Sequence, residues 1–315
     1  MALSEFEIIQ QVFQQQKVQR ADVILGIGDD GAVTKVPENH GLVLVMDTLI
    51  ENVHFPDNMR PKDIGYRSLA VNLSDLAAMG AEPAWVTLAL SLPDSNESWI
   101  KAFASGFFSL AEQYNIQLIG GDLTRGPLTI TVQAHGFVPQ GQKLVRSGAQ
   151  VGDLICVTGT LGDAAAGLTS WSETDKSFEY LRQRLARPTP RIEVGLMLRS
   201  LASSAIDISD GLLADLNHIL NASHVGASLR VEHLPLSLAL CEKYDQLESR
   251  DMALSGGDDY ELCFTIAPEN RHLLDQLSEY TQVAEIGVIE AERGLRCLLS
   301  NGSHYVPVES GYQHF

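Results

Sequence analysis

Apolar residues along the chain recur either at helical spacing or in short continuous runs, and these two patterns alternate. The first pattern is helical. In residues 3–16 the side chains of Phe6, Ile9, Val12 and Phe13 fall on one side of a helix, with glutamines on the other side. The N-terminal segment is therefore predicted to be an amphipathic helix.

The next two predicted elements each carry an aspartate. The apolar run at 41–46 predicts a short buried strand with Asp47 at its C-terminal end. Pro61 then begins a predicted helix that stops at Gly80, because proline is favoured in the first turn of a helix and glycine just after its end. Asp75 is expected to project from this helix about one turn before its end.

Strands and helices continue to alternate in the rest of the chain. The pattern predicts strands at 84–92, 117–119, 128–137, 151–158, 205–208, 227–231, 260–266 and 283–289, and helices at 98–114, 212–222 and 271–280. It breaks near 146–149, so we place a boundary between domains 1–148 and 149–315. Alternation in both halves indicates an α/β fold built of α+β layers. The basic, proline-broken segment 182–191 is interpreted as a surface loop at a helix junction.

Length and charge narrow the class of ligand. A chain of 315 residues suits two domains, each with enough apolar residues for a core. The formal charge of -18, from 22 basic and 40 acidic residues, argues against direct binding to nucleic acid or to an anionic membrane. Most of these acids are expected to form an ordinary solvated surface. An acidic protein that binds phosphates needs metal ions between itself and its ligand.

Cysteine spacing and hydropathy indicate a cytoplasmic protein. None of the four cysteines forms a C-x-x-C pair, and Cys156 and Cys263 lie in apolar runs, which predicts small core residues of a reduced protein. The first residues lack the basic start of a signal peptide. No apolar run reaches the ~18 residues that a membrane-spanning helix requires.

The glycine-rich segment 26–31 (GIGDDG) carries two adjacent carboxylates in a loop with little side-chain bulk. It matches the dinucleotide-binding fingerprint literally, and Asp47 follows at about the right distance. We reject this interpretation, because Asp29 and Asp30 would repel a pyrophosphate and no helix follows the loop. The segment beginning at Gly136 lacks the lysine and hydroxyl residue that complete a P-loop.

Acidic residues beside glycine or serine recur at predicted strand and helix ends. Besides the 26–31 loop they occur at 46–48 (MDT), 74–76 (SDL), 120–122 (GGD), 207–211 (DISDG) and 256–259 (GGDD). Taken singly, Asp47 or Asp210 could cap a helix. Asp153 could form a turn and Asp259 could be a surface charge. Taken together, such hard oxygen ligands without His or Cys clusters predict a cluster of Mg²⁺ or Mn²⁺ ions that handles phosphates.

Six longer motifs occur in a recognisable order: GIGDDGAV at 26–33, MDTLIENVHF at 46–55, VNLSDLAAMGAEP at 71–83, GGDLTRG at 120–126, AIDISDGL at 205–212 and SGGDDYEL at 255–262. With the closing GYQHF at 311–315 they cover essentially the whole chain. The series resembles the thiamine-monophosphate kinase family of the aminoimidazole ribonucleotide synthetase-like superfamily. Other members of that superfamily, such as selenophosphate synthetase and hydrogenase maturation proteins, share the acidic nucleotide site and differ in acceptor. Asp47 with His54, and the tyrosine-bearing segment 256–262, favour the thiamine enzyme.

The resemblance implies ATP-dependent phosphorylation of thiamine monophosphate to thiamine diphosphate, in a homodimer whose N-terminal domains pair their sheets. Domain 1–148 would bind ATP and metal and form the dimer, and domain 149–315 would complete the active site. The implied metal ligands are Asp30, Asp47, Asp75, Asp122, Asp207 and Asp210, with Asp29 as an auxiliary candidate. The implied nucleotide contacts are Gly121, Asp122, Arg146 and Ser209, and the implied acceptor contacts are His54, Asp258 and Tyr312.

One position departs from the family pattern, because Met46 stands where serine or threonine is common. A metal contact from that side chain is lost, and only the backbone carbonyl could substitute. No general base is assigned, since a phosphate monoester with a second pKa of ~6 is already largely deprotonated at neutral pH. Two alternatives stay open: an enzyme of the same superfamily that uses another acceptor, and a non-catalytic protein that binds metal or nucleotide.

Overall fold

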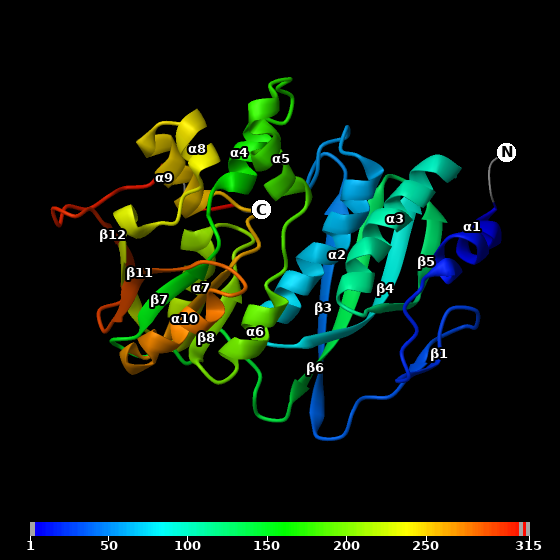
Figure 1. The fold of residues 1–315 in the computed structure, drawn as a ribbon, viewed down its shortest axis with the longest axis horizontal. Helices are drawn as coiled ribbons and strands as arrows, with labels where there is room; N and C mark the ends of the chain where they lie inside the picture. Colours follow the sequence, from blue (N-terminus) through cyan, green and yellow to red (C-terminus); the bar gives the residue numbers. More distant parts are fainter. Residues whose placement is uncertain (1–3, 309–310, 313–315) are drawn as a thin grey trace. The chain divides into compact units, whose positions relative to one another are not determined.

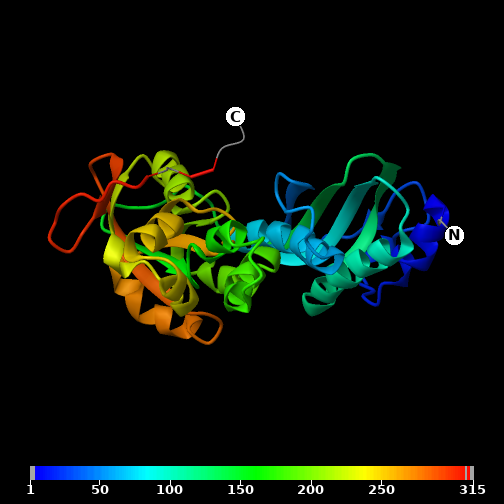
Figure 2. The same cartoon turned by 90° about the horizontal axis from the view of Figure 1, so that it is seen from above.

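A computed structural model describes residues 4–308 and 311–312, which fold into two compact units (Figures 1 and 2). Unit 1 comprises the residues up to Leu76 together with Ala81–Gly141. Unit 2 comprises Ala77–Gly80 together with the residues from Gln142 onward. The division falls a few residues before the predicted boundary after residue 148.

Unit 1 is a four-stranded sheet with helices on one face. The strands lie in the order β3-β6-β4-β5, and neighbouring pairs are antiparallel except for β4 with β5. Figures 1 and 2 show α2 and α3 packed on one side of this sheet. The elements are α1 (Glu5–Gln11), η1 (Phe13–Gln15), β1 (Val23–Leu25), β2 (Val33–Thr34), β3 (His40–Ile50), α2 (Pro61–Ala78), β4 (Glu82–Leu92), α3 (Glu97–Gln113), β5 (Gln117–Arg125) and β6 (Thr129–Pro139).

The apolar spacing of α3 explains which side of the helix faces the core. Its buried residues Ile100, Phe103 and Phe107 recur at intervals of three and four and are 0% exposed. Burying each of these side chains stabilises the unit by about 2 kcal/mol. The helix begins where the side chain of Asn96 accepts a hydrogen bond from the backbone N–H of Trp99.

The strand that carries Asp47 is longer and more exposed than the sequence predicts. The apolar run at 41–46 predicts a short buried strand, but β3 has 11 residues and pairs with β6 along its length, so Asp47 lies inside it. The prediction is wrong because β3 is an edge strand on which Leu44 and Met46 are 55% and 63% exposed. A strand with apolar side chains on an uncovered face has the same sequence pattern as a strand that is buried on both faces.

Unit 2 is a mixed sheet of six strands in the order β12-β9-β11-β7-β10-β8, with β12 parallel to β9 and the other pairs antiparallel. Its elements are β7 (Leu154–Thr158), α4 (Asp163–Thr169), η2 (Lys176–Phe178), α5 (Glu179–Ala186), α6 (Ile192–Leu198), β8 (Ala202–Asp207), α7 (Leu212–Ser223), β9 (Gly226–Arg230), η3 (Val231–His233), α8 (Leu238–Lys243), α9 (Gln246–Ser255), β10 (Leu262–Ile266), η4 (Pro268–Leu273), α10 (Leu274–Leu277), β11 (Val283–Glu290) and β12 (Gly294–Leu298). The sequence pattern misses β12 and the helices α4, α5, α6, α8 and α9, because elements this short show too few repeats to establish a period. The helix predicted at 271–280 is instead the end of η4 followed by the four-residue α10.

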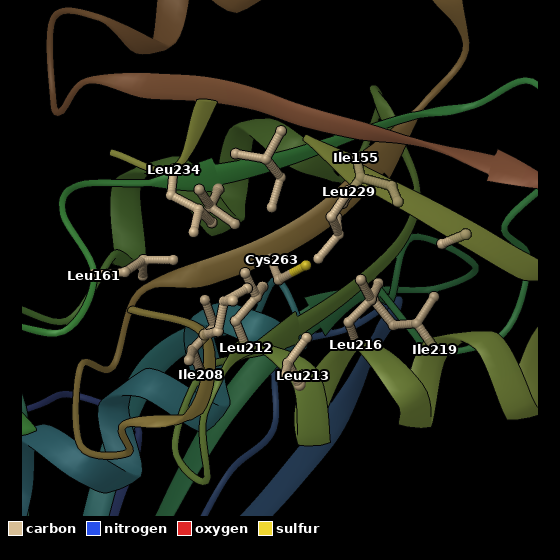
Figure 3. Close-up of a cluster of buried hydrophobic side chains, with 14 of the residues drawn as sticks. Ile155, Leu161, Ile208, Leu212, Leu213, Leu216, Ile219, Leu229, Leu234 and Cys263 are labelled. Carbon is tan, nitrogen blue, oxygen red and sulfur yellow. The ribbon is translucent and has the colours of Figure 1, made fainter. Parts of the chain in front are cut away.

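The core of unit 2 lies between α7 and the sheet. Figure 3 shows Leu212, Leu216 and Ile219 of α7 directed toward strand residues that include Leu229 and Cys263. All five side chains are fully buried. This packing confirms that Cys263 is a small core residue. The same packing anchors the first residue of α7, Leu212, and an acidic loop directly precedes this residue.

All four cysteines are free thiols, and Cys156 is buried as predicted. No helix within residues 4–308 and 311–312 combines the length and apolar character needed to cross a membrane.

Candidate active site

Asp47 and Asp75 lie on neighbouring elements of unit 1. The backbone N–H of Asp47 donates to Oδ1 of Asn72, a fully buried residue of α2, over 3.0 Å. Asp75 follows Asn72 by three residues, about one turn further along the same side of α2. The buried amide therefore sets the spacing between β3 and the helix that carries the second carboxylate. The structure brings these two predicted metal ligands to one corner of unit 1.

Gly121 and Asp122 lie inside β5, so the prediction of a strand at 117–119 followed by a turn is wrong. The strand continues because it pairs with β4 as far as Arg125. A Cβ added at Gly121 would lie 1.8 Å from the carbonyl oxygen of Leu88, so only glycine fits where the two strands pass.

Asp122 and Asp47 are not brought together within one chain. They lie on β5 and β3, the two edges of a four-stranded sheet, which places them roughly 14 Å apart at ~4.8 Å per strand. The register also assigns them to opposite faces, since Asp47 is level with the buried Val132 and Asp122 with the exposed Ala89. Two carboxylates placed in this way cannot bind the same ion.

Asp29 and Asp30 occupy an exposed loop, and the backbone N–H of Asp30 donates to Oδ1 of Asp29 over 2.9 Å. Asp29 thus helps to hold the turn that presents Asp30. His54 follows β3, and its Nδ1 accepts a hydrogen bond from the backbone N–H of Ile50 over 3.0 Å. A neutral imidazole that accepts at Nδ1 carries its proton on Nε2, so His54 can donate to an anion.

In unit 2 a residue absent from the predicted set organises the acidic loop after β8. One carboxylate oxygen of Asp215 accepts the backbone N–H groups of Ser209, Asp210 and Gly211 at 3.0, 3.0 and 3.1 Å. Asp215 is only 3% exposed, on the side of α7 that faces the core. Its signal in the sequence is an acid at the helical spacing of the buried leucines.

The same loop concentrates negative charge. Burial, and then the nearby carboxylates of Asp207 and Asp210, raise the pKa of Asp215 to about 7. A divalent cation at this loop would relieve the repulsion, and carboxylate oxygens are the donors that Mg²⁺ prefers. The carboxylates of Asp207 and Asp210 are therefore suitable ligands for Mg²⁺.

Two further segments are bonded to the same acidic loop. The backbone N–H of Asp258 donates to the carbonyl of Ser209 over 2.8 Å, and that of Tyr312 donates to the carbonyl of Asp210 over 3.0 Å. The structure thus brings together Ser209, Asp210, Asp258 and Tyr312, four residues of the predicted site. The predicted C-terminal motif continues through 313–315, which lie outside the described residues.

The basic segment 182–191 contains the predicted helix junction, between α5 and α6, but it is not the exposed surface segment that the sequence predicts. The side chains of Arg184 and Arg191 are 12% and 14% exposed, and both pair with the carboxylate of Glu261, which is 0% exposed. Arg191 donates from Nε and Nη2 at 2.6 Å each, and Arg184 donates from Nη2 at 2.9 Å. The prediction fails because charge and proline were taken as signs of exposure, while the acid that neutralises them lies far along the chain.

Asp259 is also buried, at 1% exposure, rather than a surface charge. Its carboxylate accepts the backbone N–H groups of Gly162 and Ala164 at the start of α4, over 2.7 and 3.3 Å. Burial raises the pKa of Asp259 to about 8, against the opposing charge of Arg184. Asp163 and Glu261 are buried close to Asp259, and Arg184 pairs with both of them while Arg191 pairs with Glu261.

Arg146 lies in an exposed segment next to the C-terminal end of α7, where its carbonyl accepts a hydrogen bond from Oγ of Ser223. Ser209 lies before the other end of this helix, whose 12 residues span about 18 Å. Both residues can contact one ligand only if that ligand is extended, as a nucleoside triphosphate is.

In unit 1 a cavity of about 110 Å³ lies beside Gly121 and Asp122, lined mainly by apolar side chains.

Among residues 4–308 and 311–312, no three His, Cys, Asp or Glu side chains are grouped so that they could hold a metal ion by themselves. Mg²⁺ in nucleotide sites is commonly bound by one or two carboxylates, with phosphate oxygens and water in the other positions. The Asp47–Asp75 corner and the Asp207–Asp210 loop have this two-carboxylate character.

Comparison with known proteins assigns the family. The model for AIR synthase related proteins matches residues 28–138 with its N-terminal domain and 150–299 with its C-terminal domain. The thiamine-monophosphate kinase of Escherichia coli K12 is 48% identical over 322 residues, which cover 100% of this chain and 99% of its own. The chain belongs to the thiamine-monophosphate kinase family.

Solved structures of this family share the fold. The crystal structure of thiamine-monophosphate kinase from Stenotrophomonas maltophilia K279a is 50% identical, with a TM-score of 0.88 over 94% of this chain and 97% of that one. The structure of AaThiL complexed with AMPPCP and TMP is 33% identical, with a TM-score of 0.79 over 100% and 99%. They confirm the predicted two-domain fold of α+β layers. Pairing of the N-terminal sheets in a dimer stays a prediction.

The departure from the family pattern at Met46 has a structural context. Met46 pairs with Gln133, and its side chain is 63% exposed on the sheet face opposite that of its neighbour Asp47. The methionine therefore leaves the Asp47–Asp75 corner sterically unchanged. It adds apolar surface to the uncovered face of the sheet.

Proposed function

We propose that this protein transfers the terminal phosphoryl group of ATP to thiamine monophosphate, giving thiamine diphosphate, by direct in-line, Mg²⁺-assisted transfer. The observation that carries the proposal is the similarity along the whole chain to a structure holding AMPPCP, an ATP analogue, together with TMP. The order of the acidic motifs and the name of the 48% identical relative support it.

Charge explains why the aspartates are needed. Both reactants are anionic, and two unit charges ~4 Å apart repel by ~4 kcal/mol at an effective dielectric near 20. Bound Mg²⁺ would neutralise this charge and stabilise the charge that develops during transfer. The residues proposed to hold it are Asp30, Asp47, Asp75 and Asp122 of unit 1, and Asp207 and Asp210 of unit 2.

The residues proposed to contact the nucleotide are Gly121 and Asp122 in unit 1, and Arg146 and Ser209 in unit 2. In unit 1, the apolar cavity beside Gly121 and Asp122 suits a nucleobase. In unit 2, Ser209 is held by Asp215, and Arg146 supplies a fixed positive charge.

The acceptor contacts require no strong general base. A phosphate monoester has a second pKa of ~6, so the attacking oxygen of thiamine monophosphate is already largely deprotonated at neutral pH. His54 is proposed to donate from Nε2 to this phosphate. Tyr312, 48% exposed, is proposed to stack on the thiazolium or pyrimidine ring, and Asp258 to bind the same substrate.

A homodimer paired through the sheets of unit 1 is supported by the exposed face of β3. The edge strand β3 exposes Leu44 and Met46 on the face that α2 and α3 leave uncovered, and exposed apolar surface of this kind marks protein interfaces. The predicted cytoplasmic location stays a prediction.

The test is incubation with MgATP and thiamine monophosphate, followed by chromatography. We expect thiamine diphosphate and ADP in equal amounts, and no ADP release when the acceptor is omitted. ADP without thiamine diphosphate would indicate a superfamily enzyme with another acceptor, and no acceptor-dependent ADP release would indicate a non-catalytic binding protein. Radiolabel transferred from ATP to the protein itself would contradict direct transfer.

A further inference from the structure

The turn that carries Asp258 has a backbone that side chains rarely adopt. Asp258 and Tyr260 have positive φ angles of 70° and 51°, in a region that residues other than glycine seldom occupy. The backbone N–H of Tyr260 donates to the carbonyl of Ile208, as that of Asp258 does to Ser209, both over 2.8 Å. Such a turn persists only where its surroundings over-determine it.

Two buried acids hold the turn from the interior. Asp259 binds the start of α4 through the N–H groups of Gly162 and Ala164. Glu261 accepts four hydrogen bonds, two from Arg191, one from Arg184 and one from Oγ1 of Thr158. These acids lie one residue either side of Tyr260, so the backbone between them has little freedom to relax.

The arginines fix the orientation of Glu261 as well as its charge. The paired donors of Arg191 meet both oxygens of the carboxylate, which is a geometry that a point charge cannot reproduce. Arg184 bridges Glu261 and Asp163. A Cβ added at Gly159 would lie 2.0 Å from Oε1 of Glu261, so the carboxylate packs tightly on this glycine.

We propose that Arg184 and Arg191 are positioning residues for the acceptor: through Glu261 they hold the 258–260 turn so that Asp258 is placed for thiamine monophosphate. This inference rests on the proposed function, in which Asp258 contacts the acceptor. Besides its bond to the turn, Ser209 has a second anchor in Asp215, so loosening the turn affects the acceptor more than the nucleotide.

Arg182 provides a matched control on the same helix. Its side chain is 13% exposed, like those of Arg184 and Arg191, and it donates to the carbonyls of Glu173 and Asp175. It therefore contributes to the packing of α5 without reaching Glu261 through these bonds. Replacing each arginine by lysine keeps the charge and removes the guanidinium donors, which are paired on Glu261 in Arg191 and bridge Glu261 and Asp163 in Arg184.

The experiment compares Arg191→Lys, Arg184→Lys and Arg182→Lys with wild type. KM is measured for thiamine monophosphate and for MgATP, and the Kd of thiamine monophosphate is measured by calorimetry with AMPPCP present. We expect Arg191→Lys and Arg184→Lys to raise KM and Kd for thiamine monophosphate about tenfold and KM for ATP less than about twofold. Arg182→Lys should leave the KM and Kd for thiamine monophosphate and the KM for ATP unchanged, even if its Tm falls as much as that of the two test variants.

Equal rises in both KM values, or the same effect in Arg182→Lys, would show that these arginines serve stability alone and would overturn the inference. Unchanged kinetics in whichever of the two test variants folds would overturn it as well. Both outcomes presuppose a wild type that forms thiamine diphosphate. Failure of wild type to form thiamine diphosphate would instead contradict the proposed function, and the calorimetric Kd would still report whether the turn governs acceptor binding.

Discussion

Burial separates two roles among the acidic residues of unit 2. Asp210 and Asp258 stay partly exposed at the candidate site, while Asp215, Asp259 and Glu261 are buried behind them and bond to backbone N–H groups or arginines. The sequence places Asp210, Asp258, Asp259 and Glu261 in motifs and gives Asp215 no such mark. It does not tell the two groups apart, because burial depends on partners such as Arg191 that lie far away along the chain.

The buried network has a consequence for stability that depends on pH. The pKa of Asp259 is raised from its ordinary value of 3.8 to about 8, so between pH ~4 and ~8 the folded protein keeps a proton that the unfolded chain releases. The contribution of Asp259 to the free energy of unfolding is therefore fully present below pH ~4 and is lost as the pH rises from ~4 to ~8.

Replacing this acid by a neutral amide should remove the effect. Urea titration measures how far the free energy of unfolding falls from pH 5.5 to pH 7.5. We expect this fall to be about 2 kcal/mol smaller in Asp259→Asn than in wild type. Asp94→Asn, which replaces an exposed carboxyl, is the control and should follow wild type. Parallel pH profiles for Asp259→Asn and wild type would show that Asp259 is ionised in the folded protein.

At the scale of the elements, β3 shows what sequence periodicity can and cannot give. The run at 41–46 establishes a strand, and the Pro61 and Gly80 signals place α2 within two residues of its observed ends. Periodicity does not tell which face of a strand is covered, because that depends on the order of strands in the sheet. For the same reason the sequence could not show that Asp47 and Asp122 lie at opposite edges.

The uncovered apolar face of β3 predicts how the chain assembles. We expect Leu44→Glu to convert a dimer into monomers in light scattering after gel filtration, since it places a charge in the proposed interface at 55% exposure in the single chain. Leu238→Glu changes an 84% exposed leucine of α8 in unit 2 and should leave the dimer intact. A Leu44→Glu variant that remains dimeric would place the interface elsewhere.

At the scale of the whole molecule, the family and fold could be predicted from six motifs, and the comparisons confirm both. The set of metal ligands could not be assembled from the sequence, since no single cluster of three forms among the described residues. Carboxylates from several separate segments are instead proposed to share their ions with the phosphates of ATP. A molecule of net charge -18 is consistent with this dependence on metal.

The most direct test of that claim is the rate of thiamine diphosphate formation across a Mg²⁺ titration for Asp30→Asn, Asp75→Asn and Asp210→Asn, with the exposed Asp175→Asn as control. The account predicts folded variants that lose at least about 10³-fold in rate at every Mg²⁺ concentration, while the control matches wild type. Near-normal rates in the three variants across the titration would contradict it.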